Sequence, residues 1–311
     1  MGRLSFSMTL SGNKAIDYAV HQSVIIGDAN YVYLEAGNPE GDTVFLLHGY
    51  PDNAYSWEYQ IRYLSQKGLR VIAPFLRGYA PTKTKEAAYF DRATLAQDIV
   101  NLIDNINNKR AIYLIGQDWG AAVSYGVLGA FPDKIKRALL LAVPHPVEIN
   151  RTLKRSPRHV VRSFHWFLFQ LPWLPEKIIR WNHGRFLRFL WRLWSPNFND
   201  EAHVEYIVSK QMQGTVIEDT LAYYRAALQP KFRDPKLAHV FERLNNVIST
   251  PTKVLCGTVD MRKEMLPRQR DMFTSEAEYQ FDLIEGAGHF LHREKHEQVN
   301  KEIGSWFKLD D

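Results

Sequence analysis

The chain has 311 residues, a formal net charge of +5 and a hydrophobic content of 45%, enough for one large domain or a core with an insertion. No stretch of 18 uncharged apolar residues occurs, so we expect no membrane span, and the net charge is too small to indicate a nucleic-acid partner. The first residues lack a sustained apolar segment before a cleavage site, so we expect no signal peptide. The single cysteine, Cys256, cannot form an internal disulfide, and we expect it to be buried in a strand of a cytoplasmic protein.

Short apolar runs alternate with helical patterns along the chain. Strands are predicted at 17–26, 30–35, 43–48, 70–74, 111–115, 136–142, 252–256 and 279–284, and helices near 54–67, 93–107, 119–131 and 293–307. The first two strands are joined by a short turn at 27–30 and can form an antiparallel edge. The βαβ alternation from 43 to 142 predicts an α/β fold with a mostly parallel, doubly wound, eight-stranded sheet flanked by helices. Ligands of such sheets bind at the carboxyl ends of the strands.

A mostly helical stretch from 143 to 250 interrupts this sheet after the sixth strand. We therefore expect core segments at 1–145 and 236–311 around an inserted helical lid, or cap, at 146–235. Within it, residues 151–195 carry ten lysines and arginines against one glutamate, a net charge of +9, together with five tryptophans. Amphipathic helices with a solvated arginine face explain this composition, and a membrane surface or an acidic partner remains an alternative.

The residues Gly116-Gln117-Asp118-Trp119-Gly120 stand between an apolar run and a helical stretch. This is the strand–turn–helix context of a nucleophile elbow, with an aspartate where a lipase carries serine. A serine that attacked a saturated carbon would leave a stable ether, whereas a carboxylate leaves an ester that water can cleave. An aspartate here therefore favours displacement at saturated carbon, as in an epoxide or an alkyl halide.

Three further motifs follow predicted strands: His48-Gly49-Tyr50-Pro51, Gly257-Thr258-Val259-Asp260 and Gly286-Ala287-Gly288-His289. The order of nucleophile, acid and histidine is that of the α/β-hydrolase catalytic triad. Asp118 is ionised at neutral pH and attacks without a base, His289 is expected to activate water, and Asp260 is expected to orient His289.

Over nearly its whole length the chain resembles the epoxide hydrolase branch of the α/β-hydrolase superfamily. The resemblance rests on the motifs above together with Tyr55-Ser56-Trp57, Arg77-Gly78-Tyr79 and Leu221-Ala222-Tyr223-Tyr224-Arg225. It implies that Tyr224 donates to the epoxide oxygen during ring opening. His165 stands where relatives usually have a second tyrosine, and a minority of relatives pair histidine with tyrosine for this step.

The resemblance also implies the rest of the site. The backbone N–H groups of Tyr50 and Trp119 would form the oxyanion hole, and His48 would fix the loop that carries Tyr50. Trp119, Trp166 and Pro51 would contact the substrate. No metal or organic cofactor is implied, and the expected partners are an apolar epoxide and water, with the oligomeric state left open between monomer and homodimer.

Two alternatives use the same scaffold. The pair His165-Trp166 also resembles fluoroacetate dehalogenases, but Trp119 and Ala122 occupy the positions of the arginines with which those enzymes grip the substrate carboxylate. Haloalkane dehalogenases share the tryptophan after the nucleophile, but several have an asparagine where this chain has Tyr50. A binding protein without catalysis is the third possibility, and the complete Asp–His–Asp set speaks against it.

Overall fold

The structure is a computed structural model that describes residues 19–85, 88–108 and 110–309. Its strands form one mixed sheet in the order β1-β2-β4-β3-β6-β7-β8-β9, to which the two-residue β5 adds on β2. The strands are β1 (Val20–Ile26), β2 (Ala29–Gly37), β3 (Thr43–Leu47), β4 (Arg70–Pro74), β5 (Lys83–Thr84), β6 (Ile112–Gln117), β7 (Ile135–Leu141), β8 (Thr252–Gly257) and β9 (Tyr279–Ile284).

The predicted fold class is confirmed. Strands β1 and β2 pair antiparallel, and β2 pairs antiparallel with β4. The remaining neighbours, in the sheet order β4-β3-β6-β7-β8-β9, pair parallel. The turn between β1 and β2 is shorter than predicted, because only Gly27 and Asp28 separate the two strands. Residues 17 and 18 of the first predicted strand lie outside the described residues. Strand β5 was not predicted, since two residues are too few to show a periodic pattern.

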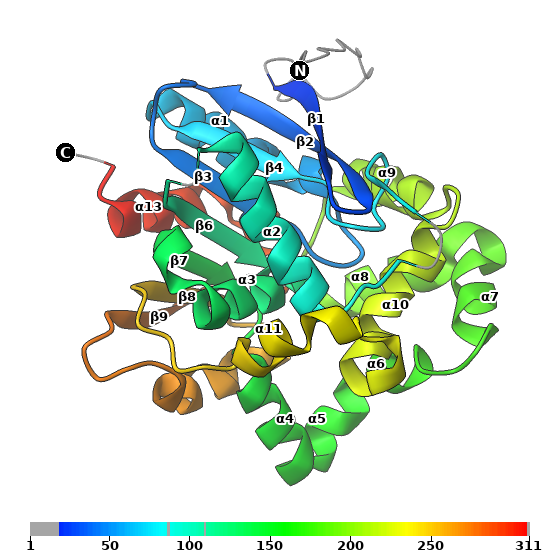
Figure 1. Ribbon diagram of the computed structural model, residues 1–311. Coiled ribbons are helices and arrows are strands. Elements are labelled where there is room, and N and C mark those ends of the chain that lie inside the picture. Colours follow the sequence, from blue (N-terminus) through cyan, green and yellow to red (C-terminus); the bar gives the residue numbers. More distant parts are fainter. Residues whose placement is uncertain (1–18, 86–87, 109, 310–311) are drawn as a thin grey trace.

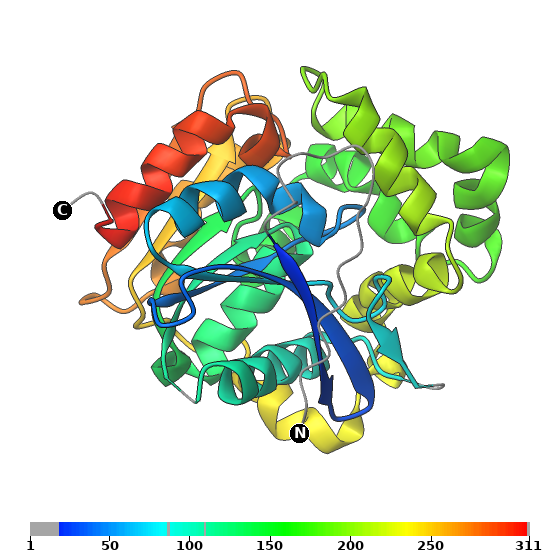
Figure 2. The same ribbon diagram turned by 90° about the horizontal axis from the view of Figure 1, so that it is seen from above.

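Helices cover both faces of the sheet (Figure 2). One face carries α1 (Glu58–Gln66) and α13 (His296–Phe307), and the other carries α2 (Arg92–Ile106), α3 (Trp119–Ala130) and α11 (Ala238–Arg243). Successive β3 side chains alternate between the two resulting cores, as the strand period of two requires: Phe45 and Leu47 pack on the α3 side, and Val44 and Leu46 pack on the α1 side. The sheet is therefore buried on both faces, which explains its continuous apolar runs.

Seven of the helices between β7 and β8, those from α4 to α10, lie together at one side of the sheet (Figure 1). They are α4 (Pro146–Arg155), α5 (Pro157–Arg162), α6 (Phe164–Leu168), α7 (Leu174–Arg180), α8 (Arg185–Trp194), α9 (Glu201–Gln211) and α10 (Val216–Leu228). We call these seven the cap helices; the exact cap limits at 146 and 235 stay a prediction. Helix α8 buries Leu187, Leu190, Trp191 and Trp194 and leaves arginines outside, the amphipathic pattern expected from the sequence.

Short helical turns complete the chain. They are η1 (Ala54–Trp57), η2 (Pro132–Lys134), η3 (Trp181–Gly184), η4 (Pro230–Phe232), η5 (Pro235–Leu237), η6 (Met261–Met272) and the four-residue α12 (Leu291–Glu294). The predicted helix at 54–67 is thus a 3₁₀ turn followed by α1. Within the described residues, no helix combines the length and the apolar character needed to cross a membrane.

Candidate active site

Asp118 occupies a strained backbone position between β6 and α3. Its φ of 51° and ψ of −117° are unfavourable for a residue with a side chain, as expected at a nucleophile elbow. The turn is tight enough to require glycine on both sides: a Cβ on Gly120 would lie 2.0 Å from the carbonyl oxygen of Leu47, and one on Gly116 would lie 2.6 Å from that of Gly120. The carboxylate makes no capping bond to α3, so it is available for chemistry.

Asp118, His289 and Asp260 form one line of polar contacts. His289 Nε2 lies 3.2 Å from Asp118 Oδ2, and His289 Nδ1 lies 2.8 Å from Asp260 Oδ2. The other oxygen of Asp118 accepts a hydrogen bond of 2.8 Å from the Tyr50 N–H. The structure thus brings together four residues that come from the ends of β3, β6, β8 and β9. The place of the Trp119 N–H in an oxyanion hole stays a prediction.

The charges of this line favour a particular protonation state. Burial opposes the charge on Asp118, but the hydrogen bond and the charge of His289, together with the charge of Arg262, hold the pKa of Asp118 below its ordinary value. The same balance lowers the pKa of Asp260. Burial disfavours the imidazolium of His289, yet its two carboxylate neighbours raise the pKa of His289. The resting site therefore favours two carboxylates around a protonated histidine.

The end of cap helix α8 holds the loop that carries His289. The His289 N–H donates to the carbonyl oxygen of Trp194 at 3.0 Å, and the Phe290 N–H donates to Ser195 Oγ at 3.1 Å. Gly288 is needed for this approach, because a Cβ there would lie 2.6 Å from the Trp194 oxygen. The cap helices therefore position the histidine as well as cover it.

Aromatic side chains close the site above Asp118. Tyr224, from α10, is buried, with ring centroids 5.1 Å from Trp119, 5.3 Å from Trp166 and 5.5 Å from Tyr50. Burial and the charge of Asp118 raise the pKa of Tyr224 well above its ordinary value, so its phenol keeps its proton. A neutral phenol in an apolar setting can donate to a developing alkoxide.

His165 belongs to the same group of rings, with its centroid 6.0 Å from that of Tyr224. It is buried, and its Nδ1 has no hydrogen-bond partner. Burial and the nearby charge of Arg262 lower the pKa of His165 to about 3. His165 is therefore a neutral imidazole near neutral pH, able to donate an N–H bond but carrying no charge.

His48 and Pro51 hold the loop that presents the Tyr50 N–H. His48 Nε2 accepts a hydrogen bond of 3.0 Å from the Leu76 N–H, and burial lowers the pKa of His48 to about 4, so the ring is a neutral structural acceptor. The carbonyl oxygen of Pro51 accepts a bond of 2.6 Å from Gln211 Nε2, at the end of α9. Pro51 is buried. Its predicted contact with substrate stays a prediction.

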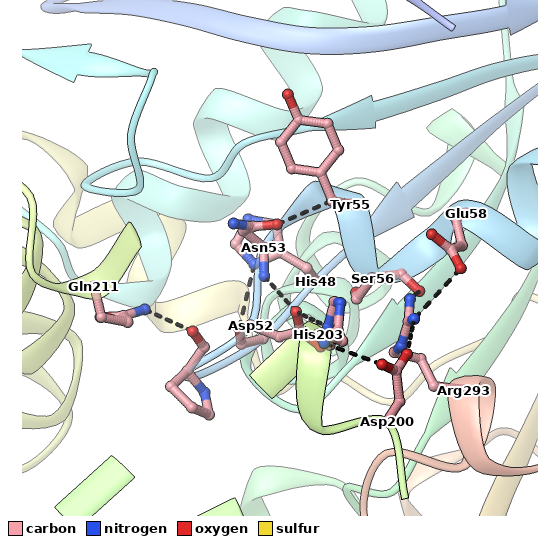
Figure 3. A network of polar contacts seen from close by, with 12 residues as sticks. His48, Asp52, Asn53, Tyr55, Ser56, Glu58, Asp200, His203, Gln211 and Arg293 are labelled. Carbon is pink, nitrogen blue, oxygen red and sulfur yellow. Dashed lines mark hydrogen bonds and ion pairs between the residues drawn. The ribbon is translucent and has the colours of Figure 1, made fainter. Parts of the chain in front are cut away.

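A second polar network joins the same loop to the cap (Figure 3). His203 Nε2 of α9 lies 3.1 Å from Asp52 Oδ1, and Arg293 Nη2 lies 2.6 Å from Asp200 Oδ2 and 3.4 Å from Glu58 Oε1. We call these five residues the core–cap junction. The junction begins two residues after Tyr50, so it ties the loop that carries the Tyr50 N–H to α9.

Arg262 is a site residue that the sequence analysis missed. Its guanidinium Nη1 lies 3.5 Å from His289 Nδ1, and only 7% of the residue is exposed. It stands two residues after Asp260, and its backbone N–H donates to Asp260 Oδ1 at 2.8 Å. The signal was a cation in the turn after the predicted triad acid. Arginines are common near the start of a helix, so the local pattern does not distinguish this one.

A cavity of about 400 Å³ reaches the catalytic line from the side of Asp260. Its lining includes Phe164, Phe189, Trp194, Asp260, Arg262 and His289. The lining thus combines apolar rings with the cationic or cation-forming side chains of Arg162, Arg262 and His289. Among the described residues, no group of His, Cys, Asp and Glu side chains has an arrangement that could hold a metal ion.

Comparisons with known proteins agree with this geometry. A family model for the alpha/beta hydrolase fold matches residues 42–175. The chain is 27% identical over 283 residues to epoxide hydrolase 4 of Homo sapiens, covering 89% of this chain and 75% of that protein. It is 26% identical over 300 residues to epoxide hydrolase A of Mycobacterium tuberculosis, covering 88% of this chain and 93% of that protein. The crystal structure of epoxide hydrolase A from Mycobacterium thermoresistibile has the same fold, with a TM-score of 0.77 at 23% identity over 93% of this chain and 98% of that one.

Proposed function

We propose that this chain, a hydrolase that belongs to the α/β-hydrolase superfamily and groups with its epoxide hydrolases, converts an epoxide to a vicinal diol through an ester on Asp118. The observation that carries the proposal is the strained, uncapped Asp118, in contact with His289 on one oxygen and with the Tyr50 N–H on the other. A serine hydrolase has no use for a carboxylate at this position, whereas displacement at a saturated carbon requires one.

In the first step, an Asp118 oxygen attacks one ring carbon, and the ring C–O bond breaks. The electron pair moves to the epoxide oxygen, which takes a proton from Tyr224 and accepts a hydrogen bond from the neutral His165. The low pKa of Asp118 keeps the nucleophile ionised, and the raised pKa of Tyr224 keeps the donor protonated. The product of this step is a hydroxyalkyl ester and a Tyr224 phenolate.

In the second step, formation of the ester removes part of what raises the pKa of His289. Esterification removes the negative charge of Asp118, which is one of the two charges that raise the pKa of His289. The histidine then gives up its proton, which passes through water to the Tyr224 phenolate, and the neutral ring takes a proton from the water that attacks the Asp118 carboxyl carbon. The Tyr50 N–H stabilises the tetrahedral oxyanion. Collapse breaks the ester bond and the imidazolium protonates the departing diol oxygen, while the proton left on the Asp118 carboxyl passes to His289 and restores the resting site.

The aromatic surroundings support a substrate with apolar substituents. Trp119 stacks on Trp166, and Trp166 contacts the ring of Tyr224. Phe164 lines the cavity. Apolar rings of this kind bind hydrocarbon groups. Water is the only other reactant that the two steps need. We keep the prediction that the enzyme acts in the cytoplasm.

The test is a variant that stops after the first step. We expect His289→Gln incubated with styrene oxide to accumulate an adduct equal in mass to the whole epoxide, mapped to the peptide of Asp118 by mass spectrometry. The matched control, His48→Gln, removes a buried histidine of the same loop system and should show no accumulation. An adduct that forms only from haloalkanes or haloacids, without their halogen, would favour hydrolytic dehalogenation. No adduct from any of these substrates would contradict the proposal.

A further inference from the structure

We propose that Arg262 binds an anionic group of the substrate, so that the preferred epoxides carry a carboxylate a few atoms from the ring. This inference rests on the proposed function and names the substrate class of the same site. It begins with a buried arginine that forms no ion pair with any of the described residues.

Arg262 differs from the other deeply buried arginines of the site region. Arg77 pairs with Asp98 at 2.7 Å and with Asp28 at 2.6 Å, and Arg293 pairs with Asp200 and Glu58. Within the described residues, Arg262 makes no ion pair, and its one polar side-chain contact is with His289 Nδ1 at 3.5 Å. An unpaired buried cation is strongly unfavourable unless a ligand completes it.

The contact with His289 does not satisfy the guanidinium. Nδ1 must carry its proton in order to donate to Asp260, so Arg262 Nη1 and His289 Nδ1 are two donors facing one another. Within the described residues Asp260 forms no ion pair with the guanidinium: its Oδ2 contacts the histidine, and its Oδ1 accepts from the Arg262 backbone N–H. The guanidinium N–H groups are therefore free to bind a ligand in the cavity that Arg262 lines.

The cavity matches a molecule with an apolar body and one anionic end. Phe164, Phe189 and Trp194 form an apolar wall, and Arg262 supplies a planar, always-charged donor set that suits a carboxylate. A second arginine, Arg162, lies at the exposed part of the same cavity. Solvent screens the charge of the exposed Arg162, whereas Arg262 is buried, so we assign the anion contact to Arg262 alone.

The position of Arg262 sets the length of the preferred substrate. Arg262 touches the Nδ1 edge of the His289 ring, and Asp118 touches the Nε2 edge. The charge of Arg262 also reaches Asp118, His165 and Tyr224, so it lies within the same enclosed centre. A carboxylate held by Arg262 and an epoxide carbon held at Asp118 are thus separated by about the width of an aromatic ring.

The experiment compares 4-(oxiran-2-yl)benzoate with its neutral amide, 4-(oxiran-2-yl)benzamide. These rigid probes share their shape and differ in charge. We expect the wild-type kcat/KM for the carboxylate to exceed that for the amide by about 10- to 100-fold, the value of one charge-assisted bidentate contact. In Arg262→Gln the ratio should fall close to 1, and Arg262→Lys should restore part of it.

The matched control is Arg162→Gln, which removes an exposed arginine from the same cavity and should leave the ratio within about twofold of wild type, since solvent screens that charge. An equal loss for both probes in Arg262→Gln, with the ratio unchanged, would overturn the inference and make Arg262 a positioning residue for His289. Good turnover of the amide with no preference for the carboxylate in the wild type would also overturn it, and would leave the proposed function standing. Absence of turnover with either probe, combined with no Asp118 adduct in His289→Gln, would contradict the proposed function itself.

Discussion

The catalytic centre and the core–cap junction lie on opposite sides of one loop and treat buried charge differently. At the junction, each charged group contacts a partner: Asp52 contacts His203, and Arg293 forms an ion pair with Asp200. In the centre, Arg262 forms no ion pair with any of the described residues, and its side chain contacts only His289. The junction thus pairs its charges within the chain, whereas we propose that Arg262 pairs with the substrate.

This difference separates the two ways in which a substitution can act. A change in the centre removes chemistry and relieves unfavourable burial, so it should lower turnover more than stability. A change at the junction leaves a buried charge alone, so it should lower stability more than chemistry. The following experiments test that separation, from the largest expected effect to the smallest.

The largest effect is expected from Asp118→Ala. Without the carboxylate no ester forms, so kcat for styrene oxide should fall by about 10⁴-fold or more. Stability should also fall, because the bond from the Tyr50 N–H and the contact with His289 are lost, but far less in proportion than turnover. Steady-state kinetics and a thermal melt measure both; residual turnover above about 1% of wild type would argue against a nucleophile at this position.

Tyr224→Phe should slow ester formation by about 10²- to 10³-fold, the usual contribution of a positioned proton donor. Single-turnover formation of the adduct in the His289→Gln background measures this step directly. The adjacent Tyr223 offers a control, because its hydroxyl donates to the carbonyl oxygen of Arg77 at 2.6 Å instead of facing the nucleophile. Tyr223→Phe should lose about 1 kcal/mol of stability and retain most of the ester-forming rate. Equal rate losses in the two variants would remove the assignment of Tyr224 as the donor.

Arg293→Met and Arg262→Met compare the two regions most directly. The first leaves Glu58 and Asp200 without their cation, so the free energy of unfolding should fall by about 3 kcal/mol. The second removes an unpaired buried charge, so stability should stay within about 1 kcal/mol of wild type or increase. Urea unfolding of both variants provides the measurement. A large loss of stability in Arg262→Met would mean that this arginine has a structural partner after all.

The smallest effect concerns stability in mild acid. Burial lowers the pKa of His292 to about 3, and the pKa of His145 and His165 to about 3 as well. An unfolded chain binds these protons near pH 6.5 and the folded chain does not, so each histidine makes the folded state lose stability as pH falls below 6.5. The slope is about 1.4 kcal/mol per pH unit for each residue.

Between pH 6.5 and 5, the free energy of unfolding should therefore fall by about 2 kcal/mol less in His292→Leu than in the wild type. His292 is suited to this test because it is fully buried against Trp57 and neither ring nitrogen has a hydrogen-bond partner. Replacing the exposed His183 by leucine is the control and should leave the slope unchanged. An unaltered slope in His292→Leu would show that this histidine is protonated in the folded state.

The fold was predictable because its signals are local. Apolar runs of strand length, interrupted by helical periods, predicted the strands from β3 to β7, apart from β5, and their parallel arrangement, but not their order in the sheet. The interruption between β7 and β8 was visible as a change in composition. The short β5 was not, because it has no periodic pattern and forms only by pairing with β2.

Part of the site was predictable for a similar reason. Asp118, Asp260 and His289 each follow a strand, and the carboxyl ends of parallel strands meet at one edge, so their convergence could be expected from order alone. Arg262 could not be recognised in this way. Its role depends on which carboxylates lie near its guanidinium and on the enclosure of the cavity. The local sequence around Arg262 specifies neither.

The sequence by itself determined the scaffold, the elbow at Asp118 and the chain order of the reacting groups, because each depends on neighbours within a few residues. Only the tertiary structure decided the protonation of His289, the isolation of the Arg262 charge and the contact of the His289 loop with the end of α8. These properties depend on distances between segments far apart in the chain and on the exclusion of water from between them, since charges interact strongly only where the surroundings are dry.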